Sequence, residues 1–177
     1  MKQIAEGFVK ADEKPLLFVD VDGVISLFGF APSDSMPGRF HFVDGISHCI
    51  GSDAGRRLEA LRDHFKLVWA TGWEEKANEY LPYLLELPEL DLPVLTFDGQ
   101  ATFGSAHWKI DAIDEYAADR PAAWIDDNID ADCERWARER GAPTLLVPTD
   151  AAVGISDEHV EQLLAWADEH RRSVQAS

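Results

Sequence analysis

Short apolar stretches of β-forming residues alternate with longer amphipathic stretches along most of the chain, and this alternation most constrains the fold. The predicted strands are 16–21, 66–70, 93–97, 122–125 and 144–147. Strands that are separated by helices pair in parallel, because each crossover returns the chain to the same end of the sheet. The sequence therefore predicts an α/β fold with a doubly wound parallel sheet of about five strands.

One stretch interrupts the alternation. Residues 24–50 are rich in Gly, Pro, Ser and aromatic residues, which predicts an irregular flap with a hairpin near 40–46. The stretch is too short for a folded domain, and so is 97–109. We therefore expect one domain over 1–177, with its core at about 15–170.

Two carboxylates end the first predicted strand. Asp20 and Asp22 are two positions apart, so strand alternation places both on the same side. Two anions this close repel each other unless a cation neutralises them, and a hard divalent metal is the natural partner. Gly23 follows and allows a sharp turn of the backbone.

Other polar residues also stand at strand ends, where parallel sheets bind their ligands. Thr71 and Gly72 end the second strand, and Lys109 opens the helix before the fourth. Asp126 and Asp127 end the fourth strand. Each feature alone has an ordinary structural explanation as a helix cap, a turn or a solvated surface residue. Their order after successive apolar strands indicates one functional site.

This order resembles the four motifs of the haloacid dehalogenase (HAD) superfamily. The corresponding residues are, in order, Asp20 with Asp22, Thr71, Lys109, and Asp126 with Asp127. The resemblance covers about 15–166, and the segments ATGWEEKAN, AWIDD and TLLVP are more narrowly similar to the HAD domain of RNA-repair fusion proteins. It implies a HAD-like Rossmannoid fold without a cap domain, because neither usual insertion point holds one.

The resemblance implies a Mg²⁺-dependent phosphohydrolase that acts through an aspartyl-phosphate. Asp20 would attack phosphorus, and Asp22 would protonate the leaving oxygen and then activate water. Thr71 would hold a phosphoryl oxygen, and Lys109 would balance negative charge. An acid at Asp22 also favours phosphate esters or anhydrides over carbon–halogen bonds, since a halide leaves without a proton.

The implied metal site uses both acidic pairs. Mg²⁺ would bind Asp20, the backbone carbonyl of Asp22 and one carboxylate of the last pair. Alignment of the last pair with the commoner Gly-Asp form makes Asp127 the expected ligand, while Asp126 orients Lys109 or a metal-bound water. Which of the two aspartates binds the metal directly stays open.

Aromatic residues are the candidates for substrate contact. Gly72 and Trp73 follow Thr71, so we expect both beside the substrate. The flap adds four phenylalanines that either line the site or pack the flap on the body: Phe28, Phe30, Phe40 and Phe42. Without a cap, we expect modest efficiency on small esters and a preference for an aromatic or base moiety, with either the flap or a partner subunit closing the site.

Several other titratable residues are expected to be structural. The histidines without metal-ligand spacing are His41, His48 and His107. The aspartates that either start a helix or support the metal from further out are Asp130 and Asp132. The cysteines, far apart in sequence and expected to be reduced thiols, are Cys49 and Cys133.

The net charge of −17 makes general affinity for nucleic acid unfavourable, because phosphate backbones are repelled. No stretch has the length of a signal peptide or a membrane span, so we expect a cytoplasmic protein without membrane contact. The leading hypothesis is a phosphomonoesterase for a small phosphorylated metabolite or nucleotide. The alternatives are a nucleic-acid end phosphatase of the RNA-repair type and a phospho-acceptor or scaffold without turnover. The oligomeric state stays open.

Overall fold

The computed structural model describes residues 14–32 and 35–176. Its main sheet holds four parallel strands in the order β5-β1-β6-β7. Their bounds are Leu16–Val19 for β1, Lys66–Trp69 for β5, Ala122–Asp126 for β6 and Thr144–Pro148 for β7. The α/β fold and its parallel sheet confirm the prediction from the alternating pattern.

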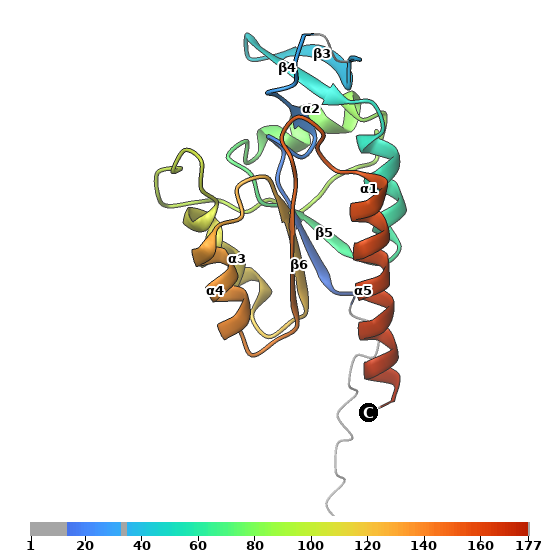
Figure 1. The fold of residues 1–177 in the computed structure, drawn as a ribbon, viewed down its shortest axis with the longest axis vertical. Coiled ribbons are helices and arrows are strands. Elements are labelled where there is room, and N and C mark those ends of the chain that lie inside the picture. The colour runs from blue at the N-terminus through green and yellow to red at the C-terminus, as the bar shows by residue number, and fades with distance from the viewer. Residues whose placement is uncertain (1–13, 33–34, 177) are drawn as a thin grey trace, which may run out of the picture.

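Helices cover both faces of this sheet (Figure 1). The helices are α1 Ala54–Arg62, α2 Lys76–Leu84, α3 Ile110–Ala117, α4 Ala131–Glu139 and α5 Asp157–Gln175, with a 3-10 turn, η1, at His107–Lys109. Figure 1 shows α1 and α5 on one side of the sheet and α3 and α4 on the other. None of the helices among the described residues has the length and apolar character needed to cross a membrane.

Alternation along β1 divides the core into two layers. Leu17 and Val19 pack into the hydrophobic cluster formed with α1, α2 and α5. Leu16 and Phe18 point the other way, into the cluster formed with α3 and α4. All four side chains are buried. A strand that is buried on both faces has apolar residues at every position, so β1 could be predicted from its continuous apolar sequence.

The expected strand at 93–97 is reduced to a single bridge. Val94 pairs with Trp69 at the edge of the sheet. The Trp69 N–H donates to the Pro93 carbonyl at 2.9 Å, and the Leu95 N–H donates to the Trp69 carbonyl at 3.0 Å. The side chain of Asn78 bonds both backbone groups of Leu92, which ends the pairing on one side. The sheet therefore has four strands and a fifth segment bound at one position.

The flap forms a small antiparallel sheet in the order β2-β4-β3. Its strands are β2 Ser26–Leu27, β3 Gly38–Val43 and β4 Ile46–Gly51. Asp44 and Gly45 form the hairpin turn with φ values of 50° and 80°. Asp44 also pairs with Lys76 and accepts a 2.8 Å bond from the Tyr80 hydroxyl, so the hairpin tip is tied to α2. The predicted hairpin is confirmed, and the described part of the flap contains no separate cap domain.

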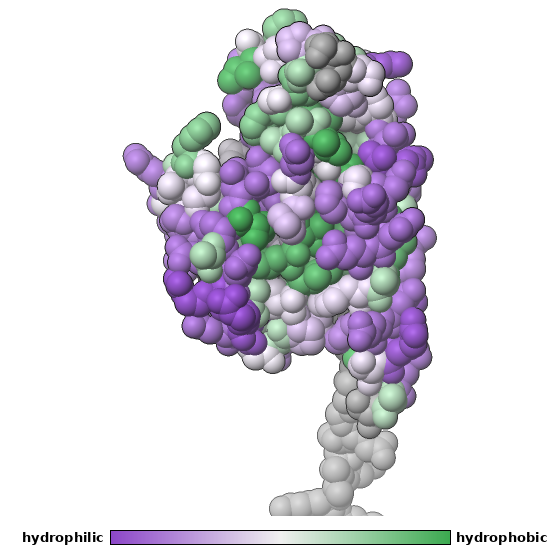
Figure 2. Space-filling model, viewed as in Figure 1, coloured by the Kyte–Doolittle hydropathy of each residue, from purple (hydrophilic) through white to green (hydrophobic). Residues whose placement is uncertain are grey.

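Most of the surface seen in the view of Figure 1 is hydrophilic, as Figure 2 shows. Hydrophobic residues gather over the middle of that face, where the edge of the sheet lies. Strand β7 forms this edge, and its Leu145 and Leu146 are half-buried. The candidate site residues lie elsewhere, at the carboxyl ends of β1 and β6.

Candidate active site

Parallel pairing of β1 with β6 brings the first and last acidic pairs together. Val19 stands opposite Ile125, so Asp20, just after β1, and Asp126, the last residue of β6, lie at the same level. The Asp20 N–H donates to the Ile125 carbonyl at 3.1 Å, which extends the ladder by one step. Both aspartate side chains are buried at the carboxyl edge of the sheet.

Lys109 joins these two aspartates from η1. Its Nζ lies 2.9 Å from Asp20 Oδ1 and 2.6 Å from Asp126 Oδ2. The lysine is buried, which alone would lower its pKa, but the charges of Asp20 and Asp126 outweigh burial and raise the pKa of Lys109. The ammonium group is therefore charged and fixed between two carboxylates.

The last acidic pair divides into two roles by position. Asp126 uses one oxygen for Lys109, and its other oxygen accepts the Asn128 N–H at 2.9 Å. The Asp127 carboxylate instead lies against Gly23, where an added Cβ would be 2.3 Å from Asp127 Cγ. Gly23 also has a φ of 79°, so both conformation and space require glycine there.

The site carries an excess of buried negative charge. Ligand atoms of Asp20, Asp126 and Asp127 all lie within 4.8 Å of one another. Burial raises the pKa of Asp20 to about 8 despite the opposing charge of Lys109. Burial and the neighbouring Asp126 raise the pKa of Asp127 to about 6. Clustered carboxylate oxygens are the donors that Mg²⁺ prefers, and a divalent cation would relieve this repulsion, so the residues fit the expected metal.

Asp22 lines the same cavity as this cluster, and its side chain is 52% exposed. Its Oδ2 accepts a 3.1 Å bond from the Trp73 indole N–H. His48 Nδ1 lies 3.8 Å from Asp22 Oδ1 and 2.9 Å from the Ser26 hydroxyl. The rings of His48 and Trp73 meet edge to face at 4.7 Å. Trp73 and His48 therefore orient the proposed acid.

Thr71 and Gly72 differ in their access to the site. Gly72 lines the cavity in front of Asp20. Thr71 is fully buried, and its Oγ1 accepts a 3.2 Å bond from the Trp73 N–H. Neither Thr71 nor Trp73 is among the described residues that line the cavity. The structure therefore brings six of the expected residues to one cavity and places Thr71 and Trp73 beside it: Asp20, Asp22, Gly72, Lys109, Asp126 and Asp127.

The cavity has a volume of about 450 Å³ and an aromatic rim. Of the four flap phenylalanines, Phe28 lines it, while Phe30, Phe40 and Phe42 are not among the lining residues. Sequence reasoning missed the other lining residues, which are Ala101, Thr102, Phe103, Gly104, Ser105, Trp108 and Asn128. Trp108 stands next to Lys109 in sequence and could have been found on that ground. Phe103 lies in a segment without any periodic pattern, so no signal identified it.

A strand-end DxD pair, a lysine between buried carboxylates and a second acidic pair on a parallel sheet define a HAD-like domain without a cap. The profile of the family described as "HAD domain in Swiss Army Knife RNA repair proteins" matches residues 16–160, and the chain belongs to this family. Membership supports a HAD-type hydrolase in general terms.

Comparison with solved structures supports the fold. The chain is similar to the HAD domain of effector protein Lem4 from Legionella pneumophila, with a TM-score of 0.54 and 15% sequence identity. The match covers 90% of this chain and 98% of that one. A search of curated protein sequences found no match.

Proposed function

We propose that this protein is a Mg²⁺-dependent phosphomonoesterase that acts through an aspartyl-phosphate on a small phosphorylated metabolite or nucleotide. The observation that carries the proposal is the position of Asp20. Its carboxylate is buried, paired with Lys109 at 2.9 Å, and borders an open cavity. A fixed, charge-balanced carboxylate that meets a cavity is suited to nucleophilic attack on phosphorus.

The reaction would proceed in two steps. Asp20 attacks phosphorus, so an acyl phosphate forms and the bond from phosphorus to the ester oxygen breaks. Asp22 gives its proton to the departing alcohol. Asp22 then takes a proton from water, which attacks phosphorus and returns Asp20 as a free carboxylate with inorganic phosphate as product. The bond from Trp73 holds Asp22 in place for both transfers.

The proposed metal ligands are Asp20, the backbone carbonyl of Asp22 and Asp127. When bound, Mg²⁺ would neutralise the anionic charge that gathers in the site. Asp126 is the less suitable ligand, because Lys109 and the Asn128 N–H occupy its two oxygens. Lys109 would stabilise the charge of the transferring phosphoryl group.

The residues after β5 have less direct roles in this proposal. Gly72 borders the cavity and leaves room for the phosphoryl group. The Thr71 hydroxyl is held by the Trp73 backbone, so its contact with a phosphoryl oxygen stays a prediction. Trp73 acts on Asp22 rather than as a wall of the cavity.

Charge at the cavity favours a small ester over a nucleic-acid end. Among the described residues that line it, Lys109 is the single basic side chain, against four aspartates. Affinity for polynucleotides comes mainly from several lysine or arginine contacts with phosphates, which this surface lacks. The name of the family refers to RNA repair, but the cavity of this chain is better suited to one phosphate group than to a strand.

A phosphatase screen tests the proposal. The panel holds an aryl phosphate, nucleoside monophosphates, sugar phosphates and end-phosphorylated oligonucleotides, each with Mg²⁺ or with EDTA, and Asp20→Asn is the control. We expect Mg²⁺-dependent release of phosphate from a small ester, and weaker competition by oligonucleotide than by nucleotide. Phosphate release from oligonucleotides alone would support the end phosphatase. Stable labelling of the protein without release would support a phospho-acceptor.

A further inference from the structure

We propose that Phe28 and Phe103 form an aromatic clamp that selects phosphate monoesters whose alcohol carries a planar ring. The clamp would select among substrates of the proposed phosphatase, so its effect on catalysis rests on the proposed function. Both phenylalanines line the cavity that contains Asp20, although they lie 75 positions apart in sequence. Trp108 lines the same cavity and packs edge to face on Phe97 at 4.8 Å.

Neither Phe28 nor Phe103 is buried by the described part of the protein. Phe103 is fully exposed, at 105% of its reference area, and Phe28 is 51% exposed. Scattered apolar side chains on a surface are ordinary. These two exposed side chains are not scattered, because both line the cavity that contains the proposed nucleophile. A ligand that entered the cavity would cover both of them. Burial of such a side chain by a ligand is favourable, because apolar surface leaves water.

A glycine with a positive φ follows each phenylalanine. Gly29 and Gly104 have φ values of 78° and 75°, and no atom lies within 4 Å of the position where a Cβ would be. Glycine adopts this conformation readily, so the backbone after each phenylalanine follows a path that other residues rarely allow. In Figure 1 the segment 98–106 projects from the body beside η1. The two rings thus reach the cavity from separate segments of the chain.

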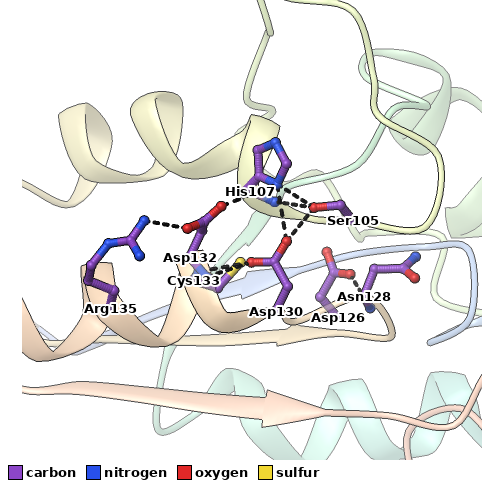
Figure 3. A network of polar contacts seen from close by, with 8 residues as sticks. All are labelled: Ser105, His107, Asp126, Asn128, Asp130, Asp132, Cys133 and Arg135. Atoms are coloured by element: carbon purple, nitrogen blue, oxygen red, sulfur yellow. Dashed lines mark hydrogen bonds and ion pairs between the residues drawn. The ribbon is translucent and has the colours of Figure 1, made fainter.

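A polar network holds the segment that carries Phe103 (Figure 3). The Ser105 hydroxyl donates to Asp130 Oδ2, and His107 Nδ1 lies 3.1 Å from the same oxygen. The Ala106 N–H donates to the Asn128 carbonyl at 3.0 Å. These bonds tie the end of the segment to the residues that follow β6. Phe103 is therefore only two residues from an anchor that is continuous with Asp126 and Asp127.

The same network is an anchor rather than a second metal site. Ligand atoms of His107, Asp130 and Asp132 lie within 4.8 Å of one another. Asp130 Oδ1 already accepts the backbone N–H groups of Asp132 and Cys133 at 3.0 Å, as the cap of α4. Asp132 is paired with Arg135. These carboxylate oxygens are already bound by groups of the protein, and the bonds fix the position of the loop.

The chemistry of the rim defines the ligand. Phenyl and indole rings are uncharged and attract the flat faces of other rings. A planar ring is found both in simple aromatic alcohols and in nucleobases, and both can stack. The cavity volume of about 450 Å³ accommodates a phosphate together with such a group. Saturated rings of the same size fill the space but lack this preference.

The test compares benzyl phosphate with cyclohexylmethyl phosphate, two primary alkyl esters that differ mainly in the planarity of the ring. The ratio of their kcat/KM values is measured in the wild type, Phe103→Leu and Phe28→Leu. We expect the wild type to favour the benzyl ester by roughly 3- to 10-fold, and each leucine variant to lose most of this preference. Phe42→Leu is the matched control, because Phe42 is 77% exposed and does not line the cavity. Equal ratios in all four proteins would overturn the clamp.

A binding measurement separates the clamp from the proposed function. Benzylphosphonate and cyclohexylmethylphosphonate are not hydrolysed, so calorimetry with Mg²⁺ reports ring preference without turnover. Tighter binding of benzylphosphonate, lost in Phe103→Leu, supports the clamp even if no ester is hydrolysed. Hydrolysis of esters with equal binding of both phosphonates supports the function and overturns the clamp. Adenosine 5′-monophosphate against ribose 5-phosphate then distinguishes a base from a simple aromatic group as the ring that is recognised.

Discussion

The cavity has two contrasting parts, a charged floor and an aromatic rim. The floor consists of Asp20, Lys109 and Asp126, which are buried and joined by contacts of 2.6–2.9 Å. The rim consists of Phe28 and Phe103, which are exposed. Two strand ends and the turn η1 hold the floor, whereas the rim lies outside the helices and strands.

This contrast separates rate from selectivity. Interactions at the floor would act on the phosphoryl group, which every substrate of this kind shares. Interactions at the rim would act on the alcohol, which differs from one substrate to another. Changes at the floor should therefore lower turnover for all esters alike, while changes at the rim should alter which ester is preferred.

The largest effect is expected from Asp20→Asn. The amide keeps the shape of the side chain but removes the attacking oxygen, so kcat should fall by about 10⁴-fold or more on every ester. Steady-state assays on the benzyl and cyclohexylmethyl esters measure this loss, and thermal unfolding shows whether the variant is folded. Retention of most of the turnover, with deamidation excluded by mass spectrometry, would remove Asp20 from the mechanism.

The next largest effect is expected from Asp22→Asn. Loss of the acid should lower the rate by about 10²–10⁴-fold on alkyl esters. An aryl ester with an acidic leaving group should lose less in the first step, which pre-steady-state kinetics measures. Trp73→Phe is the matched variant, because it keeps a ring but loses the N–H bond to Asp22, and its loss should be smaller. Equal losses on good and poor leaving groups would argue against this role of Asp22.

The metal requirement distinguishes the two aspartates that end β6. EDTA should stop turnover, and Mg²⁺ should restore it. Asp127→Asn should raise the Mg²⁺ concentration needed for half-maximal rate by about tenfold or more, because changing a residue that supports a bound metal lowers the metal affinity by about this factor. Asp126→Asn should instead lower kcat, since it disturbs Lys109. A larger rise in Mg²⁺ requirement for Asp126→Asn than for Asp127→Asn would exchange these assignments.

The smallest effect concerns the anchor of the rim. Burial would raise the pKa of Asp130, but bonds from Ser105, the Cys133 backbone and His107 outweigh it and hold the pKa below its usual range. A lowered pKa in the folded state stabilises the protein above the unfolded pKa of about 3.9, and the stabilisation is lost as the pH falls through the folded value.

Asp130→Ala should therefore reduce the free energy of unfolding by about 1 kcal/mol at neutral pH, the usual value of a helix cap. The difference from the wild type should shrink as the pH is lowered below 4. Denaturant unfolding at several pH values measures it, with Asp119→Ala at the surface as control. A difference that stays constant down to pH 2 would contradict a stabilising charge at Asp130.

The floor could be predicted from the sequence for a physical reason. Parallel strands place their carboxyl ends at one edge, so residues that follow buried apolar runs meet in space. This logic located Asp20 and Asp126, which lie far apart in the chain. Lys109 opens a helix, and the order of the motifs identified it. The helix cap at Asp130 was predictable too, because its bonds are local.

The rim could be predicted only in part, since Phe28 was among the phenylalanines considered for the site and Phe103 was not. Phe103 reaches the cavity because of a loop whose position depends on Ser105 and Asp130, and no periodic pattern encodes such a contact. Aromatic content singled out Phe28 correctly, but it also singled out Phe40 and Phe42, which are exposed and do not line the cavity. The indole of Trp73 was expected to contact the substrate, but its bond to Asp22 depends on a rotamer that spacing does not determine.

The most direct test of the account is to trap the phosphorylated protein. A ³²P-labelled ester is mixed with excess protein and Mg²⁺, the reaction is stopped in acid after milliseconds, and the labelled peptide is identified. We predict an acid-stable, hydroxylamine-sensitive label on Asp20 that forms and decays as fast as turnover and is absent from Asp20→Asn. Rapid turnover without any label on Asp20, or a label on another residue, would contradict the central claim.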